Sequence, residues 1–209
     1  MFITLEGIEG SGKTTQAALL ADALRRRGRS VLLTREPGGS PLGGALRAIL
    51  LSEAHAPSPR CELLLYLAER AEHVEKVIAP ARARGQWVVC DRFGDATRAY
   101  QAFGRGLPRD LVEALHAAAT GGLEPDLTLY LRVGLEEGLK RARDRDRARS
   151  GRDEGRFEAE PLDFHRRVLE GYERLAAEYP GRIAAVEASG RVEEVHGRIL
   201  RLLEARGVL

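Results

Sequence analysis

The chain has 209 residues, 44% of them apolar, which is enough for one folded domain with a buried core and excludes a disordered chain. Its 33 lysines and arginines nearly balance 31 aspartates and glutamates, so we expect no nucleic acid among its partners. The apolar runs are short, so no membrane span is expected, and a strand at the amino end leaves no room for a signal peptide. Cys61 and Cys90 fit no metal-site spacing, and we expect both to be reduced in a cytoplasmic protein.

Strand and helix signals alternate along the chain. In chain order the predicted elements are a strand at 2–5, a helix at 14–27, a strand at 30–34, helices at 43–51 and 62–84, a strand at 86–90, helices at 96–103 and 109–119, a strand at 126–131, a helix at 134–144, a strand at 182–186 and a helix at 192–206. Pro80 is expected to disturb the long helix at 62–84, because proline lacks the N–H that an α-helix needs. The alternation predicts an α/β protein whose parallel sheet is covered on both faces.

One segment, residues 141–160, breaks this alternation. Nearly every residue of "RARDRDRARSGRDEGRFEAE" is charged, glycine or alanine. Such a run is usually a solvated helix end followed by a loop. It is also what a mobile lid needs if its arginines close over phosphates. Composition leaves both interpretations open, within a single domain of residues 1–209.

A glycine-rich loop follows the first predicted strand. Gly7, Gly12, Lys13 and Thr14 satisfy the pattern G-x-x-x-x-G-K-[ST] between a strand and a helix, as this motif requires. Backbone N–H groups of such a loop wrap around a phosphate, and the positive end of the following helix faces the same anion. Lys13 is expected to bridge β- and γ-phosphate oxygens, and the Thr14 hydroxyl to ligate Mg²⁺. The predicted nucleoside triphosphate site comprises Gly7, Ile8, Glu9, Gly10, Ser11, Gly12, Lys13, Thr14 and Thr15.

Charged residues stand at the ends of two later strands, where ligands of open α/β sheets gather. Asp91 closes the strand at 86–90 and is the expected second residue directed at Mg²⁺, although a carboxylate there can also cap a helix or a turn. Arg92 follows it and is placed to hold a second phosphate. Arg35 ends the strand at 30–34, directly before a turn that contains Pro-Gly-Gly.

Three functions are compatible with these features. A small chain with a phosphate loop and arginines at strand ends is typical of a nucleotide kinase. The sequence lacks the N-K-x-D motif with which signalling GTPases bind guanine, so that class is not expected. A deoxynucleoside kinase of similar fold would use a carboxylate after the second strand as general base, a place that Glu36 occupies, although Arg35 beside it favours a phosphate acceptor. A non-catalytic ATP-binding switch would keep the triphosphate site but have little use for Arg92.

Four motifs in order give the chain a family resemblance. "GIEGSGKTT", "TREPGG", "DRF" with "AYQ" after it, and "TGGLEPDLTLYL" together resemble the thymidylate kinase family over nearly the whole chain. The resemblance implies the adenylate-kinase-like P-loop fold with a five-stranded parallel sheet. It also implies ATP-dependent phosphorylation of dTMP to dTDP, with Mg²⁺, by a cytoplasmic homodimer.

The resemblance further implies how the acceptor nucleotide is bound. Glu9 would accept a hydrogen bond from the sugar 3′-hydroxyl, and Arg35 and Arg92 would hold the phosphate. Tyr100 would lie under the sugar and exclude a 2′-hydroxyl. The thymine contacts would come from three further residues: stacking by Tyr66, an O4 contact by Arg70 and an N3 contact by Thr97.

The phosphate loop itself carries no arginine, so the resemblance implies the family type whose catalytic arginines lie in the lid. Arg152 and Arg156 would then contact the γ-phosphate, together with Lys13 and Arg92 as the other catalytic residues. Arg141 would lie against the adenine.

Overall fold

Five short apolar strands form one parallel sheet, as the sequence predicts. The computed structural model describes residues 1–148 and 155–209. The strands are β1 (Phe2–Glu6), β2 (Val31–Arg35), β3 (Trp87–Asp91), β4 (Leu127–Arg132) and β5 (Ile183–Glu187), in the order β2-β3-β1-β4-β5. Every residue of the central strand β1 is buried, which explains why it reads as an apolar run with no alternation. Since all strands are parallel, their carboxyl ends meet at one edge.

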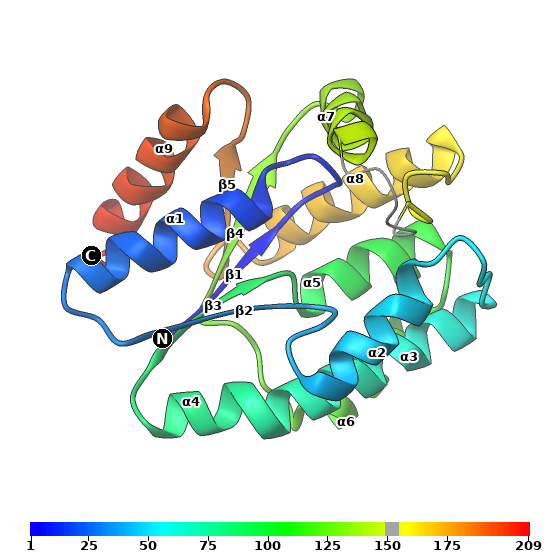
Figure 1. The fold of residues 1–209 in the computed structure, drawn as a ribbon, viewed down its shortest axis with the longest axis horizontal. Helices are drawn as coiled ribbons and strands as arrows, with labels where there is room; N and C mark the ends of the chain where they lie inside the picture. The colour runs from blue at the N-terminus through cyan, green and yellow to red at the C-terminus, as the bar shows by residue number, and fades with distance from the viewer. Residues whose placement is uncertain (149–154) are drawn as a thin grey trace.

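Helices cover both faces of this sheet (Figure 1). They are α1 (Lys13–Arg26), α2 (Pro41–Leu51), α3 (Pro59–His73), α4 (Ala79–Ala83), α5 (Gly94–Thr97), α6 (Arg109–Thr120), α7 (Leu135–Ala148), α8 (Leu162–Glu178) and α9 (Val192–Ala205), with π-helical turns η1 (Val74–Ile78) and η2 (Arg98–Gly104). α1 and α9 lie side by side over one face, and α8 packs against η2 and β5. None of the described helices combines the length and the apolar character that a membrane span needs.

Two helical regions differ from the sequence expectation. The helix expected at 62–84 is divided into α3, η1 and α4, and the π turn Val74–Ile78 lies just before Pro80. A π turn shifts the hydrogen-bond ladder by one residue, so the missing N–H of proline is tolerated there. The 17-residue helix α8, by contrast, was absent from the prediction.

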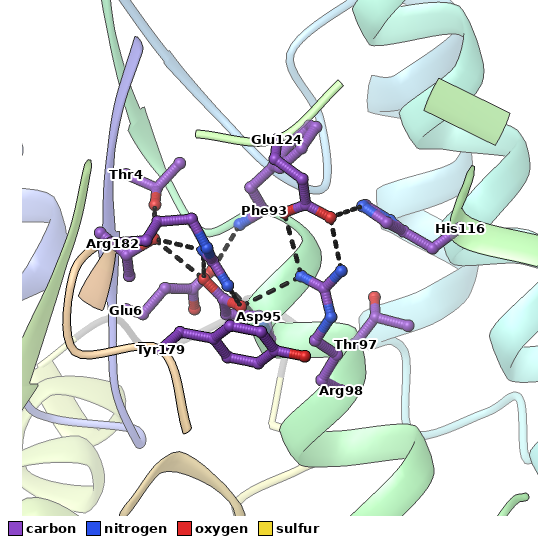
Figure 2. A network of polar contacts seen from close by, with 12 residues as sticks. Thr4, Glu6, Phe93, Asp95, Thr97, Arg98, His116, Glu124, Tyr179 and Arg182 are labelled. Atoms are coloured by element: carbon purple, nitrogen blue, oxygen red, sulfur yellow. Dashed lines mark hydrogen bonds and ion pairs between the residues drawn. The ribbon is translucent and has the colours of Figure 1, made fainter. Parts of the chain in front are cut away.

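A buried polar network ties the second half of the sheet to the helical turn after β3 (Figure 2). The Asp95 carboxylate of α5 accepts hydrogen bonds from Arg98, from the Thr128 hydroxyl on β4 and from Arg182, which lies just before β5. Arg98 also donates to Glu124. α5 is therefore fixed across the sheet, and the residues that follow it are held at the edge where the strands end.

Candidate active site

The loop between β1 and α1 has the geometry of a phosphate cradle. Gly12 precedes α1 with a left-handed φ of 90°, a conformation that favours glycine. The first N–H groups of α1 point out of the helix start, where they are available to an anion. The sequence prediction of a loop that binds phosphate through its backbone is consistent with this geometry.

Lys13 lies folded under this loop. Its Nζ donates to the carbonyl oxygens of Gly7 at 3.0 Å and Ile8 at 2.7 Å, and to the Ser11 hydroxyl at 3.1 Å. Burial, and then the charge of Arg92, lower the pKa of Lys13 to about 7. A bound polyphosphate supplies negative charge and therefore favours the ammonium form.

Thr14 in the first turn of α1 and Asp91 at the carboxyl end of β3 lie in contact. The Thr14 hydroxyl donates to Asp91 Oδ2 at 2.5 Å. A hydroxyl beside a carboxylate is an oxygen donor set of the kind that Mg²⁺ takes together with substrate phosphates. The described side chains contain no group of three or more His, Cys, Asp or Glu that could hold a metal without a substrate. The two residues therefore fit a magnesium ion that arrives with a triphosphate.

Glu9 and Arg92 form the middle of the site. Glu9 Oε1 accepts hydrogen bonds from the Tyr100 hydroxyl at 2.5 Å and from Arg92 Nη2 at 3.1 Å. Burial opposes ionisation of Glu9, but Arg92 and Lys13 outweigh it and hold the pKa below its ordinary value. Arg92 itself adopts a left-handed φ of 72°, a strained conformation of the kind found at functional sites. Its Nη1 donates to Gly7 O at 3.0 Å, so the β3 end is bonded directly to the phosphate loop.

Arg70 lies on α3, at the end of the site that this helix forms. Its guanidinium is buried and donates to Glu36 through Nε at 2.7 Å, to Thr97 through Nη1 at 2.9 Å and to Phe93 O through Nη2 at 3.1 Å. Arginine has five N–H groups in a fixed plane, so these bonds leave donor capacity for a ligand carbonyl. Arg70 and Thr97 are thus brought together, as a shared contact with one base requires.

The Glu36 carboxylate is bonded to two side chains, one at each oxygen. Its Oε2 accepts from Arg70, and its Oε1 pairs with His73 Nδ1 at 2.9 Å. Burial would raise the pKa of Glu36, but Arg70 and His73 reverse this and lower it. A carboxylate held in this way is a poor general base, because ionised and fully bonded it has little affinity for a further proton.

One cavity of about 660 Å³ joins all these groups. The predicted site residues that line it are Glu9, Gly10, Gly12, Lys13, Thr14, Thr15, Arg35, Tyr66, Arg70, Asp91, Arg92, Thr97, Tyr100 and Arg141. Gly7, Ile8 and Ser11 contribute to the loop from behind, where their carbonyl or hydroxyl oxygens hold Lys13. The cavity therefore extends from the phosphate loop past the carboxyl ends of three strands to Arg70 on α3.

Two arginines and an aromatic residue on the cavity wall were missed by the sequence analysis. Arg47 of α2 lines it and donates to Pro37 O at 3.0 Å. A Cβ on Gly38 would lie 3.1 Å from Arg47 Cδ and 3.7 Å from Arg35 Nε, so these two guanidinium-bearing chains flank the same turn. Arg145 and Phe157 also line the cavity, and the centroid of the Phe157 ring lies 6.4 Å from that of Tyr66. A signal for Phe157 was present in "GRFE", whereas Arg47 lies in no motif.

The predicted lid arginines have different positions. Arg141 of α7 donates to Ala188 O at 3.0 Å and lines the cavity. Arg156 is absent from the lining, since its guanidinium donates to Leu50 O at 2.6 Å and to Glu62 at 2.7 Å. Its contact with a γ-phosphate stays a prediction. Arg152 lies outside the described residues.

Comparison with known proteins identifies the relatives of this chain. A family model described as thymidylate kinase matches residues 5–199. A thymidylate kinase of Trichlorobacter lovleyi is 53% identical over 95% of this chain and 94% of its own length, and one of a Synechococcus species is 54% identical over 99% and 95%. The crystal structure of thymidylate kinase from Ehrlichia chaffeensis superposes with a TM-score of 0.79 at 33% identity, covering 98% of both chains. The chain belongs to the thymidylate kinase family.

Proposed function

We propose that this chain transfers the γ-phosphoryl group of ATP to dTMP, forming dTDP, in one in-line step without a general base. The ATP-dependent kinase activity follows from the family. The observation that supports the in-line step is that one cavity is lined both by the glycine-rich loop and by arginine and aromatic side chains. Both substrates then meet with their phosphates at the strand ends.

The absence of a base in this proposal has a chemical reason. The attacking group is a phosphate monoester, whose second pKa is near 6, so its oxygen is already largely deprotonated at neutral pH. Glu36, the base of the rival deoxynucleoside kinase reading, has both carboxylate oxygens bonded to other side chains. Alignment and charge neutralisation by Lys13 are then what the protein has to supply.

We propose that Thr14 and Asp91 hold the Mg²⁺ of MgATP. Their oxygen atoms are adjacent at the start of α1 and the end of β3. When bound, the ion neutralises charge that develops on the phosphoryl oxygens.

We propose that the acceptor lies between the strand ends and α3. Arg35, Arg47 and Arg92 would hold its phosphate, and Glu9 its 3′-hydroxyl with Tyr100 beneath the sugar. The base would lie on Tyr66, with its polar edge toward Arg70 and Thr97 and with Phe157 on the lid side. The aromatic faces and the remaining Arg70 donor capacity support this orientation.

We propose that residues 1–209 form one kinase domain whose lid, 141–160, carries Arg152 and Arg156 toward the γ-phosphate. For Arg156 this movement breaks its bonds to Glu62 and Leu50. We expect Arg156→Ala to lower kcat by about a thousandfold, as loss of an arginine finger does, with a smaller change in KM for dTMP. A raised KM for dTMP at unchanged kcat would restrict Arg156 to holding residues 155–160 against α3.

We propose a homodimer formed through α2 and α3 and a cytoplasmic location. Leu42, Ile49 and Leu64 are 52%, 41% and 50% exposed on these two helices, which supports a covered face there. Leu63 and Leu67 on the same helix α3 are buried and belong to the core, so the proposed contact uses the side of α3 that carries Leu64. Both cysteines are free, as is usual in a reducing compartment.

The deciding experiment is a screen of nucleoside monophosphates and of thymidine as acceptors, with MgATP and detection of the diphosphate product. We expect dTDP from dTMP and no product from thymidine. Phosphorylation of thymidine would support the deoxynucleoside kinase reading, and ATP binding without transfer to any acceptor would support the non-catalytic switch.

A further inference from the structure

His165 is a buried histidine that the mechanism above does not use. It lies in the first turn of α8, is 1% exposed, and packs edge-on against the Phe164 ring at 5.6 Å. Neither of its ring nitrogens has a hydrogen-bond partner within the described part of the chain. Buried polar groups nearly always have a hydrogen-bond partner, so a buried imidazole with none at either nitrogen needs an explanation.

A second unbonded atom lies beside it. Glu9 Oε1 is held by Tyr100 and Arg92, but Glu9 Oε2 is buried and has no hydrogen-bond partner among the described residues. His165 Nδ1 is 4.0 Å from this oxygen. Two buried, complementary atoms thus face each other about 1 Å beyond hydrogen-bond distance.

The two residues differ in their access to a ligand. Glu9 lines the cavity, whereas His165 is not part of its wall. A nucleotide sugar can therefore touch the carboxylate but not the imidazole. An effect of His165 on the acceptor is therefore indirect, and the Glu9 carboxylate, 4.0 Å from Nδ1, is the polar group through which it can act.

We propose that His165 is a positioning residue for Glu9. When the acceptor 3′-hydroxyl binds Glu9, the proposed contact on which this inference rests, the carboxylate and the imidazole close this 4.0 Å gap, so that His165 Nδ1–H donates to Oε2 and fixes the plane of the carboxylate. The imidazole is then the tautomer that carries its hydrogen on Nδ1. A carboxylate held at both oxygens presents its lone pairs to the hydroxyl in one direction only, and this orientation strengthens a charge-assisted hydrogen bond.

The test compares two acceptors in each variant: dTMP and its 3′-deoxy analogue, which lacks the hydroxyl. His165→Phe keeps an aromatic ring and removes both nitrogens, and His165→Gln restores an N–H donor. We expect His165→Phe to raise KM for dTMP about tenfold, while KM for the 3′-deoxy analogue changes by less than about twofold. His165→Gln should recover most of the loss. In a Glu9→Gln background, His165→Phe should have no further selective effect.

His196→Phe is the matched control. His196 of α9 also has a buried Nδ1 without a partner in the described residues, but it lies near Arg26 and Arg27 at the far end of α1. We expect it to leave the ratio of the two KM values unchanged. Both KM values of a variant are measured on the same preparation, so partial misfolding cannot change their ratio. Equal losses on both acceptors would overturn the proposal, and so would a selective loss that persists in the Glu9→Gln background. Failure of the unaltered enzyme to phosphorylate dTMP would refute the proposed function instead.

Discussion

Glu69 is a buried carboxylate on α3 that orders the turn after β2. Its Oε1 accepts hydrogen bonds from the backbone N–H groups of Gly38 at 2.9 Å and Gly39 at 3.3 Å. Burial, and then the charge of Glu36, raise the pKa of Glu69 to about 7. Between its ordinary value of 4.5 and about 7, the unfolded chain releases this proton while the folded chain retains it. Stability therefore falls as the pH rises through this window.

Glu69→Gln should remove this pH dependence. The amide oxygen can still accept from Gly38, but the side chain no longer ionises. We expect the unfolding free energy of the wild-type protein to fall by about 2–3 kcal/mol relative to the variant between about pH 4.5 and pH 8. Urea unfolding at both pH values measures the difference. Glu75→Gln, an exposed change in η1, is the control and should show no such fall. Parallel pH profiles for wild type and Glu69→Gln would contradict the pKa argument.

At the scale of residues, the sequence identified those parts of the site that stand at strand ends. Arg35, Asp91 and Arg92 could be predicted to line the cavity because parallel strands bring their carboxyl ends to one edge. Arg47 and Phe157 could not be predicted in the same way, since their places depend on how α2 and residues 155–159 pack over that edge. Hydrophobic periodicity predicts which face of a helix is buried. It does not predict which arginine of that helix reaches a cavity.

At the scale of elements, α7 is seated directly on the phosphate loop. A Cβ on Gly10 would lie 2.0 Å from Gly138 O, and a Cβ on Gly138 would lie 2.8 Å from Glu9 O. Two glycines thus allow backbone to approach backbone, which a side chain at either position would prevent. α7 carries Arg141 and Arg145 into the cavity, so this contact sets how close they come to a bound triphosphate.

Gly138→Ala should weaken the triphosphate site more than the acceptor site. Alanine favours the helix by about 1 kcal/mol, but its methyl group forces α7 away from the phosphate loop. We expect KM for ATP to rise and kcat to fall, each about tenfold, with a smaller change in KM for dTMP. Gly134→Ala just before α7 is the matched control, because nothing lies within 4 Å of its Cβ. An unchanged KM for ATP would show that the contact does not position α7.

The strands could be predicted from their short apolar runs and most helices from their period, whereas α8 was missed next to the charged segment. Its buried positions Phe164, Val168, Tyr172 and Leu175 repeat every three or four residues, a helical period that was present in the sequence. Arginines and glutamates between them continue the composition of residues 141–160, and this masked the period. The omission mattered for function, since α8 supplies His165 and the Tyr172 hydroxyl bonded to Arg92.

At the scale of the whole molecule, several arginines join elements through buried ion pairs. Only three of the 33 basic residues are lysines, yet the net charge is +2. Arg98 alone donates to Asp95, Glu113 and Glu124, as Figure 2 shows for two of these three. A planar guanidinium can hold several carboxylates at once, which a lysine ammonium does less specifically. Arg98 therefore shows how one arginine can join several elements of the fold.

Asp95 is the carboxylate on which this arrangement depends most, because it is 1% exposed and lies between two guanidinium groups. Asp95→Asn keeps the size of the side chain but leaves Arg98 and Arg182 facing a neutral amide. Removing one partner of a buried ion pair typically costs about 3–5 kcal/mol, so we expect a loss of this order in the free energy of unfolding.

Asp163→Asn on α8 is the control. The Asp163 carboxylate is 75% exposed and paired with Arg166, so this substitution should cost less than about 1 kcal/mol. Chemical denaturation of both variants measures the difference. If the two substitutions cost the same, the network does not hold α5 to β4 and β5, and the position of Thr97 and Tyr100 has to be explained by apolar packing instead.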